Sequence, residues 1–210
     1  MMIKKCFLFL LLFSGCYMQS QELFFSTGKN FTSYDYKNSA GFSNPNLRSG
    51  DGSFYQAGMD FKLNKSAASS KVSYAISVIY NQFNAVGGTS SDDYSWKTNY
   101  LGVQNALNYT LYQNADFFTV KTKLGVATST IIKGEQYINN RVYDIASHEE
   151  FSGIVVQPNV GIDFQYSINR DIKISAGYEF SKSYNISNSS SEKLSFTNNQ
   201  IHFGFHFLLK

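Results

Sequence analysis

The last stretch of the chain, Gln200 to Lys210, constrains the fold more than any other part. From Ile201 to Leu209 every second residue is large and apolar, and the residues between them are His202, Gly204, His206 and Leu208. Side chains alternate across a β-strand, so the pattern predicts a strand with one aromatic face. In a soluble sheet this terminal strand would be an exposed edge prone to aggregation. In a closed membrane barrel it pairs with the first strand and turns its aromatic face to lipid.

The same alternation recurs in seven earlier segments of about ten residues or more, whereas no helical period extends over a useful length. The seven segments are Glu22–Tyr34, Phe54–Leu63, Lys71–Asn81, Tyr94–Tyr112, Phe117–Thr130, Phe151–Tyr166 and Ile172–Ser181. With the terminal stretch they predict eight strands, an even number suited to an antiparallel barrel.

The connections between these segments differ in length in a regular way. Short connections are expected at Asn64–Ser70, Gln113–Asp116 and Ser167–Asp171. Longer polar connections are expected at Asp35–Ser53, Gln82–Asp93, Ile131–Glu150 and Lys182–Phe196. Tight turns at one end and long loops at the other are typical of outer-membrane barrels, with both termini on the short-turn, periplasmic side.

The parity opposite the apolar face predicts a narrow, filled lumen. It carries glycines near the middle of the strands, namely Gly58, Gly102, Gly125, Gly161, Gly177 and Gly204. A barrel of about eight strands leaves room only for side chains, which gives these glycines a purpose. The same parity carries charges of both signs, namely Asp60, Lys62, Lys121, Lys123, Asp163, Lys173, Glu179, His202 and His206. Mixed charges favour an interior plugged by ion pairs over an open pore.

Two asparagines and one proline do not fit the alternation of apolar and polar residues. Asn99 and Asn105 fall on the lipid parity, which predicts a bulge or register change in that segment. Pro158 lies in the middle of a segment and lacks a ladder donor, so a bulge is expected there too. The outward aromatics are interpreted as girdles at the two membrane interfaces rather than as a ligand platform; they are Tyr74, Tyr80, Tyr109, Phe164, Tyr166 and Phe207.

The N-terminus has the layout of a secretory signal peptide. Lys4 and Lys5 precede an apolar run from Cys6 to Phe13, which is too short for a spanning helix of about 20 residues. Cleavage near Ser20 is expected. Phe13-Ser-Gly-Cys16 offers a second interpretation, a lipobox with Cys16 lipidated after cleavage.

Composition limits the remaining possibilities. The mean hydropathy of −0.24 is unlike a helical membrane protein, whereas in a membrane barrel only alternate strand residues face lipid. The net charge of +3 is small and dispersed, which predicts no nucleic-acid partner. Both cysteines lie in the N-terminal segment, so its removal leaves no thiol for a disulfide or a metal.

Together, the signal peptide, the eight segments and the aromatic last strand resemble the small outer-membrane β-barrels of the OmpA/OmpX-like superfamily. The resemblance covers roughly Gln21 to Lys210. The run Ile201–Phe207 is similar to the C-terminal signal read by the barrel-assembly machinery, which implies that machinery as a partner alongside outer-membrane lipids and lipopolysaccharide. Because no peptidoglycan-binding domain follows the last strand, the resemblance implies a barrel-only protein.

Enzymatic chemistry has little support in the sequence. His148 with Ser147, Glu149 and Glu150 lies in a predicted loop, and adjacent residues rarely form a triad. The α-carbons of His202 and His206, four apart on a strand, lie about 13 Å from each other, too far for one metal; luminal hydrogen bonding to acidic residues is the preferred role. Two acidic pairs, Asp92-Asp93 and Glu149-Glu150, offer at most weak cation binding. We therefore predict no catalytic, cofactor or metal site.

The sequence predicts an all-β protein: residues 1–20 a cleaved signal peptide, and residues 21–210 an eight-stranded antiparallel up-and-down transmembrane β-barrel in the outer membrane of a Gram-negative cell. The expected role is structural or one of surface contact through four outer loops with an extracellular partner, as a monomer. Two alternatives stay open. One is an exported lipocalin-like barrel with an apolar ligand inside, and the other is a barrel enzyme that modifies envelope lipids.

Overall fold

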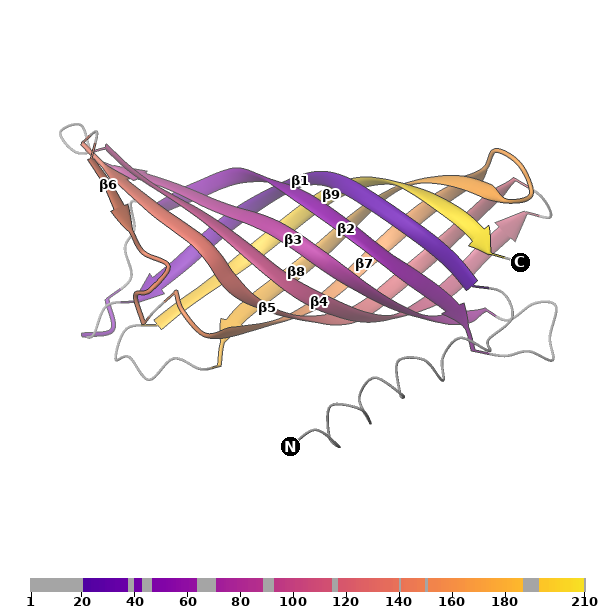
Figure 1. Cartoon of the computed structure of the whole chain (residues 1–210), viewed down its shortest axis with the longest axis horizontal. Helices are drawn as coiled ribbons and strands as arrows, with labels where there is room; N and C mark the ends of the chain where they lie inside the picture. Colours follow the sequence, from indigo (N-terminus) through magenta and orange to yellow (C-terminus); the bar gives the residue numbers. More distant parts are fainter. Residues whose placement is uncertain are drawn as a thin grey trace, which may run out of the picture.

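The computed structural model describes residues 21–37, 40–42, 47–63, 71–88, 93–114, 117–139, 141–149, 151–186 and 193–209 (Figure 1). The predicted signal peptide, residues 1–20, and the lipobox alternative at Cys16 lie outside these residues. Among the described residues, no helix has the length and apolar character that a membrane crossing requires.

Nine strands make up the described chain. They are β1 (Gln21–Lys37), β2 (Leu47–Lys62), β3 (Val72–Gly88), β4 (Asp93–Asn114), β5 (Phe118–Ile138), β6 (Arg141–Asp144), β7 (Ile154–Ser167), β8 (Ile172–Asn185) and β9 (Lys193–Leu209). Eight of them correspond to the eight predicted segments, and β6 is a short addition that pairs only with the end of β5.

The eight long strands close into one antiparallel barrel. Each pairs with its neighbour in the chain, and β5 pairs with β7 past the β6 hairpin. β1 pairs with β9 from Gln21↔Leu209 to Lys37↔Lys193, which joins the two ends of the sheet. In Figure 1 the strands cross the long axis obliquely, and the end of β9 lies at the same end of the barrel as the start of β1. The predicted fold class is confirmed, and closure leaves the long strands without free edges.

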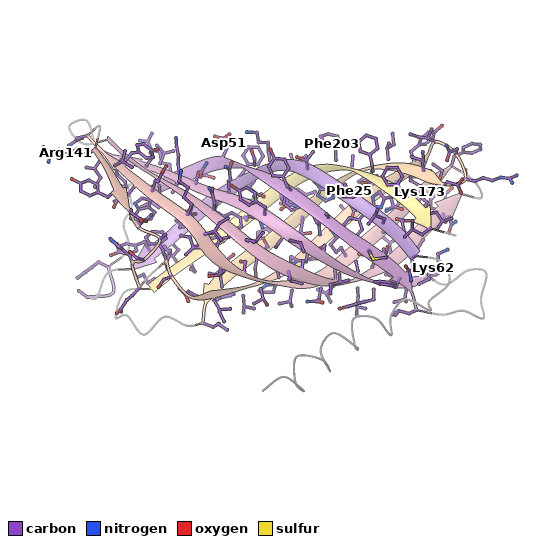
Figure 2. All side chains as sticks on the ribbon, viewed as in Figure 1. Phe25, Asp51, Lys62, Arg141, Lys173 and Phe203 are labelled. Carbon is purple, nitrogen blue, oxygen red and sulfur yellow. The ribbon has the colours of Figure 1, made fainter. Side chains whose placement is uncertain are left out.

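The apolar parity faces outward, as the sequence predicts. Phe203 and Phe205 are 63% and 57% exposed, whereas His202 between Ile201 and Phe203 is 3% exposed. Figure 2 shows Phe25 and Phe203 on the outside of the wall. The proposed girdle residues Tyr109, Phe164, Tyr166 and Phe207 also point outward. A lipocalin-like barrel needs the reverse arrangement, so that alternative is wrong: the interior is polar or filled by packed aromatic rings.

The register changes predicted for the fourth segment are present, and one of them lies beside Asn99, whereas Asn105 has none. β4 carries Asn105 outward in regular register with β3, and its amide oxygen accepts a hydrogen bond of 2.6 Å from the Tyr74 hydroxyl. Beside Asn99 the register does shift, but the extra residue is Ile132 in the partner strand β5. A second shift places an extra residue at Leu111 of β4. Asn99 therefore marked the position of one register change, although the extra residue belongs to the partner strand, and the second change at Leu111 was not predicted.

Pro158 produces no register change. Its side chain faces outward, and the pairs on either side, Val156↔Tyr184 and Asn159↔Ser181, keep one register between β7 and β8. Only the pairs between them are missing from this ladder. The strand therefore tolerates the missing donor by a local gap in hydrogen bonding, and the bulge expected there is wrong.

The strands extend farther at the loop end than the sequence predicts. β1 continues to Lys37, β3 to Gly88 and β5 to Ile138, and β9 begins at Lys193, so much of the four predicted long connections is strand. Here the outward positions become largely polar, as at Asp35, Asp51 and Lys133. Outside the membrane, the hydrogen bonds between strands form without an apolar outer face. The alternation of apolar and polar residues therefore ends before the strands end.

Candidate functional site

The lumen is the most elaborate arrangement of polar side chains in the described structure, and its inner part is a network of buried charges. Glu22 of β1 lies at the short-turn end, where its carboxylate meets Lys173 at 2.7 Å and Lys121 at 3.8 Å. The Nδ1–H of His206 donates to Glu22 Oε1 at 2.8 Å. Lys121 also contacts Asp60 at 3.1 Å. Strands β1, β2, β5, β8 and β9 are thus linked across the barrel interior.

A second group of charges lies one step farther along the same lumen. Lys123 contacts Glu179 at 3.2 Å and Asp163 at 3.8 Å. The Nε2–H of His202 donates to Asp163 Oδ1 at 2.6 Å, and the Gln104 amide donates to Glu179 Oε1 at 3.0 Å. The predicted luminal role of both histidines, hydrogen bonding to acidic residues, is confirmed. Since buried charges are expensive unless paired, the groups explain why both signs occur on this parity.

Gly177 shows why the lumen needs glycine. A Cβ built there would lie 2.3 Å from Asp163 Oδ1 and 2.6 Å from His202 Nε2, inside the hydrogen-bonded pair. The pair occupies the space that a side chain would need. At this position, predicted from the sequence to be a luminal glycine, the missing side chain leaves room for a charged pair inside a narrow barrel.

Amide and hydroxyl side chains fill the middle of the lumen. The Asn30 amide donates to Asn81 Oδ1 at 3.0 Å and accepts from Asn198 at 3.1 Å. Thr32 donates to Asn198 Oδ1 at 3.1 Å. The side chains of Asn30, Thr32 and Asn198 are almost fully buried. These hydrogen bonds join β9, β1 and β3, and along the strands they lie between the charged network and the loop end.

A small cavity of about 30 Å³ remains within the charged region. Four of the residues that line it, Asp60, Asn108, Gln165 and His202, each have a buried polar atom without a protein partner. That volume accommodates roughly one or two water molecules, which polar walls of this kind favour. The lumen therefore has room for solvent between its side chains at this level.

The loop end of the lumen contains an aromatic core that the sequence analysis did not find. Its buried members are Tyr34, Phe83, Ala85, Trp96, Tyr100, Ile145, Phe151, Val155, Leu194 and Phe196. The rings of Phe83 and Phe196 lie 4.6 Å apart, and those of Trp96 and Phe151 lie 5.4 Å apart edge to face. The Tyr34 and Thr98 hydroxyls form a 2.7 Å hydrogen bond within it. A signal was present, because these aromatics continue the luminal parity of their strands beyond the polar run.

The turn that carries Ile145 and Phe151 covers this core. Both side chains are buried, and the amides of Phe151 and Ser152 donate to the His148 carbonyl. Asn185 of β8 donates to the Ser152 carbonyl at 2.7 Å, which fastens the turn to the wall. We name the described residues 145–149 and 151–152 the cap turn. Phe151, predicted to begin a strand, is thus part of a cover over the barrel mouth.

Most predicted luminal residues lie where the sequence placed them, with two differences. Lys62, the last residue of β2, is exposed at the short-turn end because the strand ends at the barrel mouth (Figure 2). Glu22, which contacts two lysines and a histidine, was not recognised as luminal. It lies in the first segment, on the parity of Phe24, so its side chain reaches inward.

The described residues show no arrangement of side chains that supports an enzymatic site or a cation-binding site. His148 lies in the cap turn, whereas His202 and His206 are buried in the charged network. In the described part of the chain, no three His, Cys, Asp or Glu side chains are arranged to hold a metal ion. Of the two acidic pairs, Asp92 and Glu150 lie outside the described residues, and Glu149 is exposed.

A closed antiparallel barrel with an apolar exterior and a polar, side-chain-filled interior defines the class of protein: an integral outer-membrane β-barrel. The chain accordingly lies in the outer membrane of a Gram-negative cell, with its exterior in contact with lipid. No protein-family model and no curated protein matches the chain.

Several solved structures of outer-membrane proteins are similar to it. The attachment invasion locus protein Ail of Yersinia pestis, solved with the heparin analogue sucrose octasulfate, is 11% identical, with 90% of this chain and 100% of that chain covered and a TM-score of 0.43. Neisserial surface protein A is 14% identical, with coverage of 88% and 96% and a TM-score of 0.46. OprG from Pseudomonas aeruginosa is 12% identical, with coverage of 90% and 97% and a TM-score of 0.48.

Proposed function

We propose that the protein is a non-conducting barrel that holds a rigid platform outside the cell for contact with an extracellular partner. The observation that carries the proposal is the loop end itself. There the strands continue beyond the apolar band, enclose the aromatic core and are covered by the cap turn. Packing of this kind fixes the shape of a surface, and loops held on a rigid scaffold are where binding residues gather.

The platform surface is polar and of mixed charge. Lys97 lies 4.8 Å above the Tyr137 ring, and Lys133 pairs with Glu135 at 2.8 Å. The hairpin of β5 and β6 lies at this end beside β4, which pairs with β5 as far as Tyr94↔Ile138 (Figure 1), and it exposes Val142 and Tyr143. Adaptable polar groups around a few exposed apolar side chains suit contact with another macromolecule.

Two further expectations belong to this proposal. The aromatic strand β9, which closes the barrel against β1, is the segment that the assembly machinery would recognise. The protein acts as a monomer, because closure leaves the long strands without free edges and the lumen is complete within one chain.

The non-conducting part is tested in planar lipid bilayers. The wild-type protein is expected to produce no stepwise current, since the charged network and the aromatic core both cross the lumen. A variant without the buried lysines, Lys121→Ala with Lys123→Ala, provides the comparison for a loosened interior. Regular, long-lived channels from the folded wild-type protein would contradict a plugged lumen.

The surface role is tested by complementing a deletion strain with a chain in which Gln136–Tyr143 is replaced by a short Gly-Asn turn. Attachment of cells to surfaces or to each other is expected to fall, while resistance to detergents in the medium is restored as by the wild type. The heat-dependent gel shift shows that the trimmed barrel is folded. Restored attachment, or loss of detergent resistance alone, would favour a role in membrane integrity instead.

A further inference from the structure

The outer wall of the barrel has a hollow of about 540 Å³ over β1, β2, β3 and β9. It arises because a small residue, Ala57, lies between large ones. Ala57 pairs with Phe25 on β1 and with Val78 on β3, and Phe25 pairs in turn with Phe205 on β9. The volume is within the range of about 300–1,000 Å³ that is usual for small-molecule sites.

Aromatic side chains bound the hollow on both flanks. Phe25, Phe203 and Phe205 lie on one side, and the rings of Tyr55 and Tyr80 lie 6.0 Å apart on the other. Figure 2 shows Phe25 and Phe203 next to each other on the outer face of the barrel wall. The hollow belongs to the apolar band, so its surroundings in the membrane are acyl chains and not water.

A cation stands at the loop end of the hollow. Lys29 follows Thr27, which lines the hollow, by two residues along β1, a distance of about 7 Å. Its ammonium lies 3.2 Å from the Asp51 carboxylate, and the two side chains are 57% and 69% exposed. Exposed pairs of this kind are weak, so the ammonium can exchange Asp51 for another anion. Figure 2 places Asp51 nearer the loop end than Phe203 and Phe25.

The position of Lys29 at the loop end of the hollow indicates which leaflet of the membrane would supply the ligand. The short turns of this class of barrel face the periplasm, so the loop end, and with it Lys29, faces the outer leaflet. That leaflet contains acylated glycolipids whose phosphates lie at the level of the interface. An apolar trough with a cation at its outer end is complementary to such a lipid, whereas an inner-leaflet phospholipid would present its phosphate at the wrong end.

We propose that this hollow is a specific binding site for one lipid A molecule of the outer leaflet. One acyl chain lies against Ala57 between the aromatic flanks, and a phosphate group is bound by Lys29. The site is independent of the surface role proposed above and depends only on the placement of the barrel in the outer membrane.

The test is native mass spectrometry of the full-length mature protein in detergent, titrated with purified lipid A. Ala57→Phe fills the hollow, and Ala57→Leu fills it less and is the second variant should the first not fold. Lys29→Gln removes the cation. Each change is expected to weaken binding of the first lipid by about tenfold, as loss of a few buried methylenes or one charge contact predicts. Lipid A without phosphates is expected to bind wild type and Lys29→Gln equally.

Matched controls lie elsewhere on the wall. Thr128 faces outward on β5, across the barrel from β1, and Lys182 is an exposed lysine of β8 lying over the Tyr184 ring. Thr128→Phe and Lys182→Gln are expected to bind lipid A as the wild type does. The proposal is overturned if the Ala57 variants bind normally or if both controls lose binding to the same extent. It is also overturned if phosphatidylglycerol binds as tightly as lipid A, because the site would then not distinguish a glycolipid of the outer leaflet from a phospholipid.

Discussion

At Asp163 a single carboxylate meets partners from two other strands, a histidine of β9 and a lysine of β5. Neither the aspartate nor Lys123 reaches water to a large extent, so each depends on the other for compensation. Buried pairs are costly to break although they add little to stability compared with apolar side chains of the same size. We therefore interpret the buried ion pairs of the lumen as groups that specify one packing of the interior and contribute little net stability.

This gives the first prediction. Lys123→Met removes the ammonium from two carboxylates and is expected to lower the free energy of unfolding by about 3–5 kcal/mol. The double variant Lys123→Met with Glu179→Met is expected to lose less, because no charge is left unpaired at that contact. The measurement is urea unfolding in lipid vesicles. Lys29→Gln, which breaks an exposed pair, is the control and should cost no more than about 1 kcal/mol. Equal effects of Lys123→Met and Lys29→Gln would contradict the buried network.

β9 shows how one strand serves two surroundings. Its outward residues run from Leu209 through Phe205 and Ile201 and then change to Asn199, Thr197 and Ser195. The lipid boundary is thus crossed within a single strand that keeps the same hydrogen-bonded partner, β1, throughout. Position along the strand, more than residue type, determines how a substitution is tolerated.

The second prediction follows from this change from apolar to polar outward residues along β9. Phe205→Arg places a charge in the middle of the apolar band and is expected to destabilise the barrel by about 2–4 kcal/mol. Ser195→Arg lies on the same face of the same strand, beyond the band, and is expected to change stability by less than about 1 kcal/mol. Urea titration of both variants in vesicles of one lipid measures the difference. Similar losses for both would mean that the apolar band does not end before Ser195.

Strand number and facing were predictable from the sequence because a closed barrel ties both to a period of two. Phe203 and His202 show this directly, since one slip in register would exchange lipid and lumen. The charged site was predictable for the same reason: Asp60, Lys123 and Asp163 could reach no other place. Strand ends were not predictable, because beyond the lipid no apolar residue is required on the outside. The register change beside Asn99 was predictable from that polar residue on the lipid parity, but the sequence did not show that the extra residue, Ile132, lies in the partner strand β5.

The whole barrel is filled in three layers along its axis. Charges occupy the short-turn end, amides such as Asn30 the middle, and rings such as Phe83 the loop end. The same strands pass through all three layers, so no layer has its own connections to unfold separately. Small domains with such continuous contacts usually unfold in one step.

Trp96 makes this testable because it is the only tryptophan in the chain and lies in the aromatic core of the loop end. Its emission in urea is expected to change at the same midpoint as the heat-shift band on gels, which reports closure of β1 on β9. Phe83→Ala, which removes a fully buried ring from that core, is expected to cost about 3–5 kcal/mol and to move both midpoints together. Val86→Ala, at an outward position of the same strand, should move neither by a comparable amount. A tryptophan transition that comes first, with the gel band unchanged, would mean that the platform unfolds separately from the membrane barrel.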